Sequence, residues 1–146
     1  MLLLGIDIGT SSIKVSVVDA NTQQVIISGQ YPEQESDIIA KQPGWAEQSP
    51  EMWWAHVQQA FNLCKKNATF NPQDISSIGI AYQMHGLVLV DKDQQVLRDS
   101  IIWCDSRAVE IGNEAFEKLG HEFCLSHLLN SPGNFTASKL AWVKQQ

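Results

Sequence analysis

Long apolar runs are absent from the sequence. The N-terminal segment Met1-Leu-Leu-Leu-Gly-Ile6 is apolar, but Asp7 interrupts it early and no basic residue precedes it, so it does not fit a secretory signal peptide. No other stretch approaches the roughly 20 apolar residues that span a bilayer. We therefore expect a protein without a membrane partner.

Cysteine and positive charge are also scarce. The three cysteines are odd in number, widely spaced and outside any Cys-x-x-Cys pair, which favours a reducing, cytoplasmic location. Ten basic residues against sixteen acidic ones give a formal net charge of −6, which disfavours nucleic acid as a partner. His121, Cys124 and His127 recur at a spacing of three, but no fourth ligand is evident, so the segment is not predicted to bind zinc.

The apolar residues that are present suffice for one domain and predict six strands. A hydrophobic content of 44% over 146 residues is enough for a core. Residues 2–8, 13–19 and 24–31 follow one another closely and predict an antiparallel meander. Residues 75–82 are almost continuously apolar, as in a buried central strand, and 87–90 and 101–105 complete the set.

Three helices are predicted from apolar spacing and from residues typical of helix ends. The first begins at Ser49-Pro50 and ends near Lys66. The second runs from about 106 to 119 and ends at Gly120, and the third follows Asn134, with Leu140 and Val143 facing inward. Strands followed by mixed helices and strands indicate an α/β sheet with packed helices.

The turn after the first strand has the composition of a phosphate-binding site. Gly9 allows close approach of the backbone, Thr10 and Ser11 can donate hydrogen bonds, Lys14 adds positive charge, and Asp7 suits a hydrated Mg²⁺. The spacing is not that of a P-loop, and a strand instead of a helix follows. Ordinary hairpin turns use the same residue types, so turn chemistry alone leaves both interpretations open.

Four ordered segments resemble the FGGY carbohydrate kinases, most closely the xylulokinases within that family, over essentially the whole chain. The family has an actin-like ATPase fold of the ribonuclease H type, in which a mixed sheet carries packed helices. The resemblance implies that residues 1–146 are a truncated N-terminal domain, with the C-terminal domain and the general base beyond residue 146. The four segments are Gly5-Ile-Asp-Ile-Gly-Thr-Ser-Ser-Ile-Lys14, Tyr82-Gln-Met-His-Gly-Leu-Val-Leu-Val-Asp91, Ile102-Trp-Cys-Asp-Ser-Arg107 and Phe135-Thr-Ala-Ser-Lys-Leu-Ala-Trp-Val-Lys144.

The resemblance also implies roles for residues at both ligands. Met84 and His85 match the sugar-contacting pair, and Met-His-Gly is the form seen in xylulokinases, whereas glycerol kinases have Arg-Glu there. Trp103 matches an aromatic residue of the sugar pocket, and Asn134 aligns loosely with a substrate-side position. At the nucleotide, the matching residues are Asp7, near Mg²⁺ and the phosphates, then Gly9, Thr10 and Ser11 in the phosphate-facing turn, and Lys14 at a basic position.

Three further residues admit structural interpretations. Asp105 and Arg107 can form a charge pair beside the pocket or flank the following helix, and capping of that helix by Asp105 is the favoured interpretation. Trp45 lies in a long polar stretch between Pro32 and Pro50 and is interpreted as structural or as the edge of a lid.

The implied function is ATP- and Mg²⁺-dependent phosphorylation of a pentulose, D-xylulose to D-xylulose 5-phosphate. The alternatives are a kinase for gluconate, ribulose, fuculose or another polyol, and a non-catalytic actin-like sensor or scaffold. Without its general base, the isolated chain is expected to be inactive. It is also expected to expose apolar surface through which it self-associates, for example as a homodimer.

Overall fold

The computed structural model describes all of residues 1–146 and divides them into two compact units. The first unit comprises Met1–Asp37 and Glu51–Gln83, and the second comprises Ile38–Pro50 and Met84–Gln146. The assignment of the whole chain to one domain stays a prediction. None of the helices combines the length and the apolar composition needed to cross a membrane.

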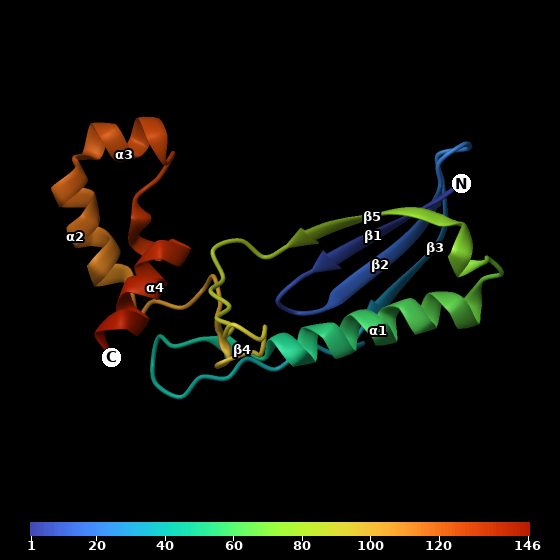
Figure 1. Cartoon of the computed structure of the whole chain (residues 1–146), viewed down its shortest axis with the longest axis horizontal. Helices are drawn as coiled ribbons and strands as arrows, with labels where there is room; N and C mark the ends of the chain where they lie inside the picture. Colours follow the sequence, from blue (N-terminus) through green and yellow to red (C-terminus); the bar gives the residue numbers. More distant parts are fainter. The chain divides into compact units, whose positions relative to one another are not determined.

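The first unit is a four-stranded mixed sheet with one helix along one face (Figure 1). Strands β1 (Leu2–Ile8), β2 (Ile13–Asp19) and β3 (Gln24–Tyr31) form an antiparallel meander, and β5 (Ile75–Tyr82) pairs in parallel with β1. The sheet order is β3-β2-β1-β5. The predicted bounds of these four strands are confirmed.

The core of the first unit lies between the sheet and α1 (Pro50–Asn67), which begins where Ser49-Pro50 predicted. Alternate residues of β1 and β2 point at the helix, as the period of two requires. Gly29 of β3 allows close packing, because a Cβ there would lie 2.7 Å from the Ala60 carbonyl oxygen of α1. The buried residues of this core are Leu2, Leu4, Ile13, Val15, Val17, Val57, Ala60 and Cys64.

The prediction that residues 75–82 form a buried central strand is wrong for these 146 residues. β5 is an edge strand, and Ile78 and Ile80 are each 60% exposed and Tyr82 is 73% exposed. In the β1–β5 register, Ile78 and Ile80 pair with Leu4 and Ile6, so they lie on the face of the sheet that carries the core. They nevertheless lie outside the group of residues that α1 buries. An apolar strand can therefore end a sheet when no element of the described chain covers it.

The second unit has little sheet and three helices. β4 (Glu47–Gln48) pairs antiparallel with β6 (Ser100–Ile101). Helices α2 (Val109–Leu119), α3 (His121–His127) and α4 (Thr136–Gln145) follow, with the short 3₁₀ turn η2 (Pro132–Asn134) before α4. A second 3₁₀ turn, η1 (Pro72–Asp74), precedes β5 in the first unit.

Several expectations for the second unit are corrected by the structure. Residues 87–90 make only isolated bridges, and the strand expected at 101–105 is confined to β6. Helix α2 starts at Val109, three residues later than predicted, and the Ser106 amide before it donates to the Gly44 carbonyl. In α4, Lys139 is buried and Leu140 is 49% exposed, so the predicted inward face is wrong at Leu140. Helix α3 was not predicted.

Candidate functional site

The β1–β2 turn is held in one conformation by its own backbone and by two neighbouring segments. A Cβ at Gly9 would lie 2.8 Å from the Ser12 carbonyl oxygen, so the turn closes only with glycine there. The Thr10 hydroxyl donates to Oε1 of Gln83 at 3.2 Å, and the Ser36 amide donates to the Ser11 carbonyl at 2.7 Å. The candidate phosphate turn is therefore rigid.

A groove of about 570 Å³ lies on the sheet next to this turn. Asp7 and Lys14 are opposite partners in the β1–β2 register, both are exposed, and neither forms a hydrogen bond or an ion pair within the chain. The floor is made of small residues, and a Cβ at Gly79 would meet no atom within 4 Å. The lining residues are Gly5, Ile6, Asp7, Lys14, Ser16, Gly79, Ile80 and Ala81.

The residues of the groove fit a phosphate with a hydrated Mg²⁺. A single uncommitted carboxylate matches the preference of Mg²⁺ for one or two protein carboxylates plus water and phosphate oxygens. The absence of side chains at Gly5 and Gly79 keeps the approach to Asp7 open. Lys14 supplies the one basic side chain in the groove and can attract an anion. Of the predicted turn residues, Gly9, Thr10 and Ser11 adjoin the groove in sequence without lining it.

The predicted sugar residues all lie in the second unit, and a direct contact joins two of them. Met84 is 67% exposed, and Trp103 is 47% exposed, so neither is an ordinary core residue. The Asn134 side-chain amide donates to the Trp103 carbonyl oxygen. His85 has a left-handed backbone, with φ of 60°, and its ring stacks on Phe135 with 4.8 Å between ring centroids.

Lys139 connects His85 to Asn134. Its side chain is fully buried, and Nζ donates to the carbonyl oxygens of His85 at 2.8 Å and Asn134 at 2.9 Å. Burial lowers the pKa of the Lys139 ammonium and outweighs the negative charge of Asp105, which raises it. The sequence pattern did not single out Lys139, because a lysine within a helix normally reaches water.

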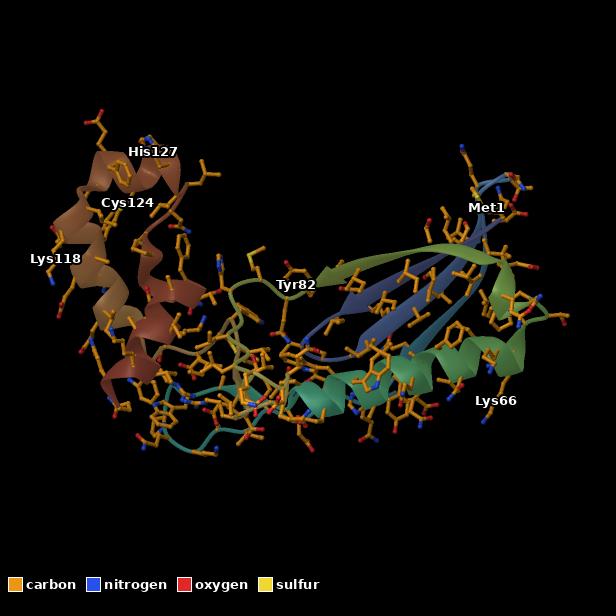
Figure 2. The ribbon with its side chains drawn as sticks, in the orientation of Figure 1. Met1, Lys66, Tyr82, Lys118, Cys124 and His127 are labelled. Atoms are coloured by element: carbon orange, nitrogen blue, oxygen red, sulfur yellow. The ribbon has the colours of Figure 1, made fainter.

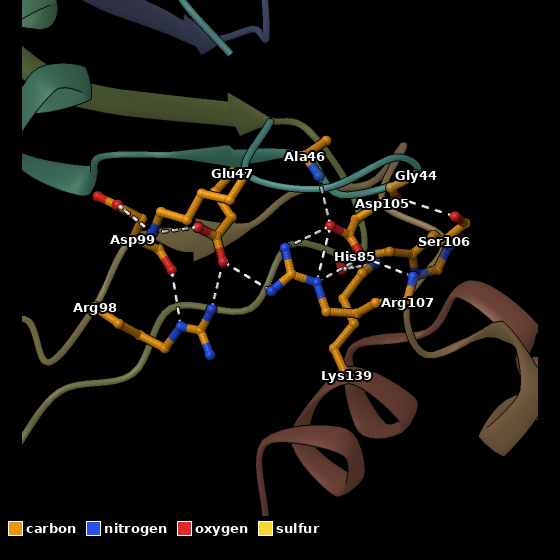
Figure 3. Close-up of polar contacts among 11 residues, drawn as sticks. Gly44, Ala46, Glu47, His85, Arg98, Asp99, Asp105, Ser106, Arg107 and Lys139 are labelled. Atoms are coloured by element: carbon orange, nitrogen blue, oxygen red, sulfur yellow. Dashed lines mark hydrogen bonds and ion pairs between the residues drawn. The ribbon is translucent and has the colours of Figure 1, made fainter. Parts of the chain in front are cut away.

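A group of charged residues around the buried carboxyl of Glu47, the Glu47 cluster (Lys41, Glu47, Arg98, Asp105 and Arg107), lies in the same unit (Figure 3). Nη1 of Arg107 lies 2.8 Å from Glu47 and Nη2 lies 2.7 Å from Asp105, and the three side chains are at most 1% exposed. Burial raises the pKa of the Glu47 carboxyl, but hydrogen bonds from Lys41 and Arg107 outweigh it and hold the pKa below its ordinary value.

The favoured capping role of Asp105 is wrong, and the charge pair is correct. Asp105 accepts from the Arg107 amide at 2.9 Å, whereas α2 begins at Val109 without a side-chain cap. The guanidinium of Arg107 also lies 3.8 Å from the ring of Trp45, which packs edge-on against Trp142. Trp45 is therefore structural. The residues around Glu47 do not indicate its role, because its partner Arg107 is 60 residues away.

His121, Cys124 and His127 all lie on the single short helix α3. Figure 2 labels Cys124 and His127 on it. His121 stacks on Phe116 at 4.0 Å, and its Nε2 lies 2.8 Å from Glu117. Cys124 is buried, and no group of three or more metal-ligating side chains occurs in the chain.

Comparison with known proteins gives the class and then the family. The solved structures that match over nearly the whole chain include a xyloylose kinase from Brucella ovis, 31% identical with a TM-score of 0.84, which covers 100% of this chain and 30% of that one. A gluconate kinase from Lactobacillus acidophilus is 26% identical with a TM-score of 0.79, over 99% and 28% of the two chains. The fold is thus that of the sugar kinases with an actin-like ATPase architecture.

The family is shown by sequence. The profile of the FGGY family of carbohydrate kinases, N-terminal domain, matches residues 2–146. The xylulose kinase of Bacillus subtilis (strain 168) is 36% identical over 149 residues, which cover 98% of this chain and 28% of that protein. The chain belongs to the FGGY carbohydrate kinase family. It spans less than a third of the length of the relatives it matches.

Proposed function

We propose that residues 1–146 form the N-terminal part of an ATP-dependent cytoplasmic kinase that phosphorylates a pentulose, converting D-xylulose to D-xylulose 5-phosphate. Membership of the FGGY family supports sugar kinase activity. The relative from Bacillus subtilis is named a xylulose kinase, which supports the choice of pentulose. In this proposal the general base and the C-terminal domain lie beyond residue 146.

The nucleotide phosphates are assigned to the β1–β2 turn and its groove. Asp7 would hold a hydrated Mg²⁺, and Lys14 and the amides of the turn would bind phosphate oxygens. Bound Mg²⁺ supplies charge neutralisation at the phosphates, which is the main electrostatic aid to phosphoryl transfer. The Asp7 carboxylate has no hydrogen-bond or ion-pair partner within the chain, which supports this assignment. A structural acid such as Asp105, by contrast, is paired with Arg107.

The sugar is assigned to the turn that carries Met84 and His85. A neutral imidazole can both donate a hydrogen bond to a sugar hydroxyl and accept one, while a thioether and an indole pack against the carbon chain. The observation that carries this assignment is the exposure of Met84 and Trp103, two large apolar side chains that the second unit leaves accessible. His85 is a binder in this proposal and not the base.

Gluconate is the second candidate substrate, because one of the matching solved structures is a gluconate kinase. Gluconate carries a carboxylate, whereas xylulose is uncharged. Ribulose, fuculose and other polyols remain members of the test panel. A non-catalytic sensor or scaffold is the outcome in which no sugar is phosphorylated.

The test measures ADP release by the full-length protein with Mg-ATP and the panel D-xylulose, D-ribulose, L-fuculose, gluconate and glycerol. Turnover that depends on D-xylulose supports the proposal. His85→Ala should lower kcat/KM for the sugar by about tenfold or more, and Asp7→Ala should abolish turnover. The matched controls are His127→Ala and Asp93→Ala, two residues outside both assigned sites. A preference for gluconate would make gluconate the substrate in place of D-xylulose. No turnover with any member of the panel would refute the proposal of a kinase.

A further inference from the structure

The turn that presents His85 is in contact with the start of α4 and with the residue that precedes this helix. The His85 ring stacks on Phe135 at an interplanar angle of 17°, and the Thr136 hydroxyl donates to the Gly86 carbonyl at 3.4 Å. The Lys139 backbone amide donates to the Phe135 carbonyl at 3.2 Å in the first turn of α4, so the stacking residue lies at the start of the helix that carries Lys139. Both supports of His85 therefore depend on residues 135–139.

The backbone of His85 needs such support. A φ of 60° places His85 in the left-handed region, which non-glycine residues occupy infrequently and hold only where the surroundings determine it. The Lys139 ammonium lies 2.8 Å from the His85 carbonyl oxygen and so fixes the peptide plane that follows the left-handed residue. Together with the stack of the His85 ring on Phe135, this contact holds the backbone from which the imidazole projects.

Lys139 is an unusual residue for a purely structural role. It is fully buried and forms no ion pair with any carboxylate, so the chain carries an ammonium whose only observed acceptors are two backbone carbonyls. Burying a charge is unfavourable, and an apolar side chain of the same length would fill the space without that penalty. The other carbonyl belongs to Asn134, which also holds the Trp103 backbone.

We propose that Lys139 is the positioning residue of the sugar site, where its ammonium bridges the His85 and Asn134 carbonyls and thereby orients the His85 imidazole and the Trp103 segment toward the substrate. The inference rests on the proposed function and deepens it. Lys139 touches no substrate and acts through His85 and Asn134. Its loss should therefore weaken sugar binding and leave nucleotide binding unchanged.

The test compares Lys139→Met, which keeps the length of the stem and removes the donors, with Lys144→Met, an exposed lysine of the same helix, in the full-length protein. Calorimetry with D-xylulose and initial rates with Mg-ATP give the sugar Kd and both KM values. We expect the sugar Kd and KM to rise about tenfold in Lys139→Met with less than a twofold change in the KM for ATP, and no change in Lys144→Met. Lys139→Arg should restore part of the affinity.

A second measurement does not depend on activity. The imidazole C–H resonances of His85, assigned by loss of signal in His85→Gln, should carry the ring-current shift of the stacked Phe135 and should lose it in Lys139→Met. Phe135→Leu reports on the same stack if Lys139→Met does not fold. An unchanged sugar Kd and an unchanged His85 resonance in Lys139→Met would overturn the inference alone, whereas wild-type protein that binds no sugar would overturn the proposed function with it.

Discussion

Replacing Glu47 by glutamine should destabilise the second unit strongly. The Glu47 carboxylate is 1% exposed and receives Arg107 at 2.8 Å, Lys41 at 2.9 Å and Arg98 as a third partner. Glutamine keeps the shape and removes the charge, so the buried guanidinium of Arg107 retains only one carboxylate partner, Asp105. Removing one partner of a buried ion pair costs about 3–5 kcal/mol, and we expect the lower end because the amide oxygen still accepts a hydrogen bond.

The assay is urea denaturation at pH 7 followed by circular dichroism, with a thermal melt in parallel. A loss of about 3 kcal/mol corresponds to a Tm lower by roughly 6–12 °C for a chain of this length. Glu110→Gln is the matched control, because Glu110 is an exposed residue of α2 in the same unit and should change the stability by less than about 0.5 kcal/mol. A Glu47→Gln variant as stable as Glu110→Gln would refute the reasoning.

The pH dependence of the stability of wild type and of Glu47→Gln tests the electrostatic cause of the loss. The folded pKa of Glu47 is held below its ordinary value of 4.5, so the charged form contributes stability that is fully present above that value and is lost as the pH falls through the folded pKa. The difference in the free energy of unfolding between wild type and Glu47→Gln should therefore be constant near neutral pH and shrink below about pH 4.5. A difference that persists unchanged at lower pH would assign the effect to packing.

Three further predictions follow from burial and close contact. Gly29→Ala should lower stability by about 1–3 kcal/mol in urea denaturation, because the new Cβ would lie 2.7 Å from a carbonyl oxygen of α1, whereas Gly79→Ala should not, because nothing lies within 4 Å. In thiol labelling of the native protein, the exposed Cys104 should react fast and Cys64 slowly, since burial raises the pKa of the Cys64 thiol; equal rates would contradict this. Ile80→Ser should reduce any self-association of the chain in light scattering, and an unchanged mass would exclude β5 as the contact.

The first unit could be predicted closely from the sequence because its signals are local. Alternating apolar residues gave the bounds of β1, β2 and β3, and a proline after a capping residue gave the start of α1. The candidate nucleotide site was predicted with them, since Asp7 and Lys14 come into register simply by the closure of one hairpin. The burial of β5 could not be predicted, because an apolar run indicates only that a surface can be covered and does not say by what.

The second unit could not be predicted to the same degree, because its structure depends on contacts between residues distant in sequence. Glu47 contacts Arg107 across 60 positions, and Lys139 contacts His85 across 54. Neither pair leaves a periodic pattern. The resemblance supplied Met84, His85, Trp103 and Asn134, and the structure adds the residues that hold them.

The two candidate sites therefore differ in how their geometry is maintained. Asp7 and Lys14 project from paired strands, and the backbone ladder of the sheet holds them whatever the neighbouring side chains are. His85 projects from a left-handed turn, so its direction depends on a side-chain ammonium and a stacked ring. Substitutions remote from the ligand should consequently alter the sugar site more readily than the nucleotide site. A set of conservative changes at Lys139, Phe135 and Asn134 should shift the sugar KM and leave the KM for ATP in place, and equal shifts in both would show that the turn is not independently held.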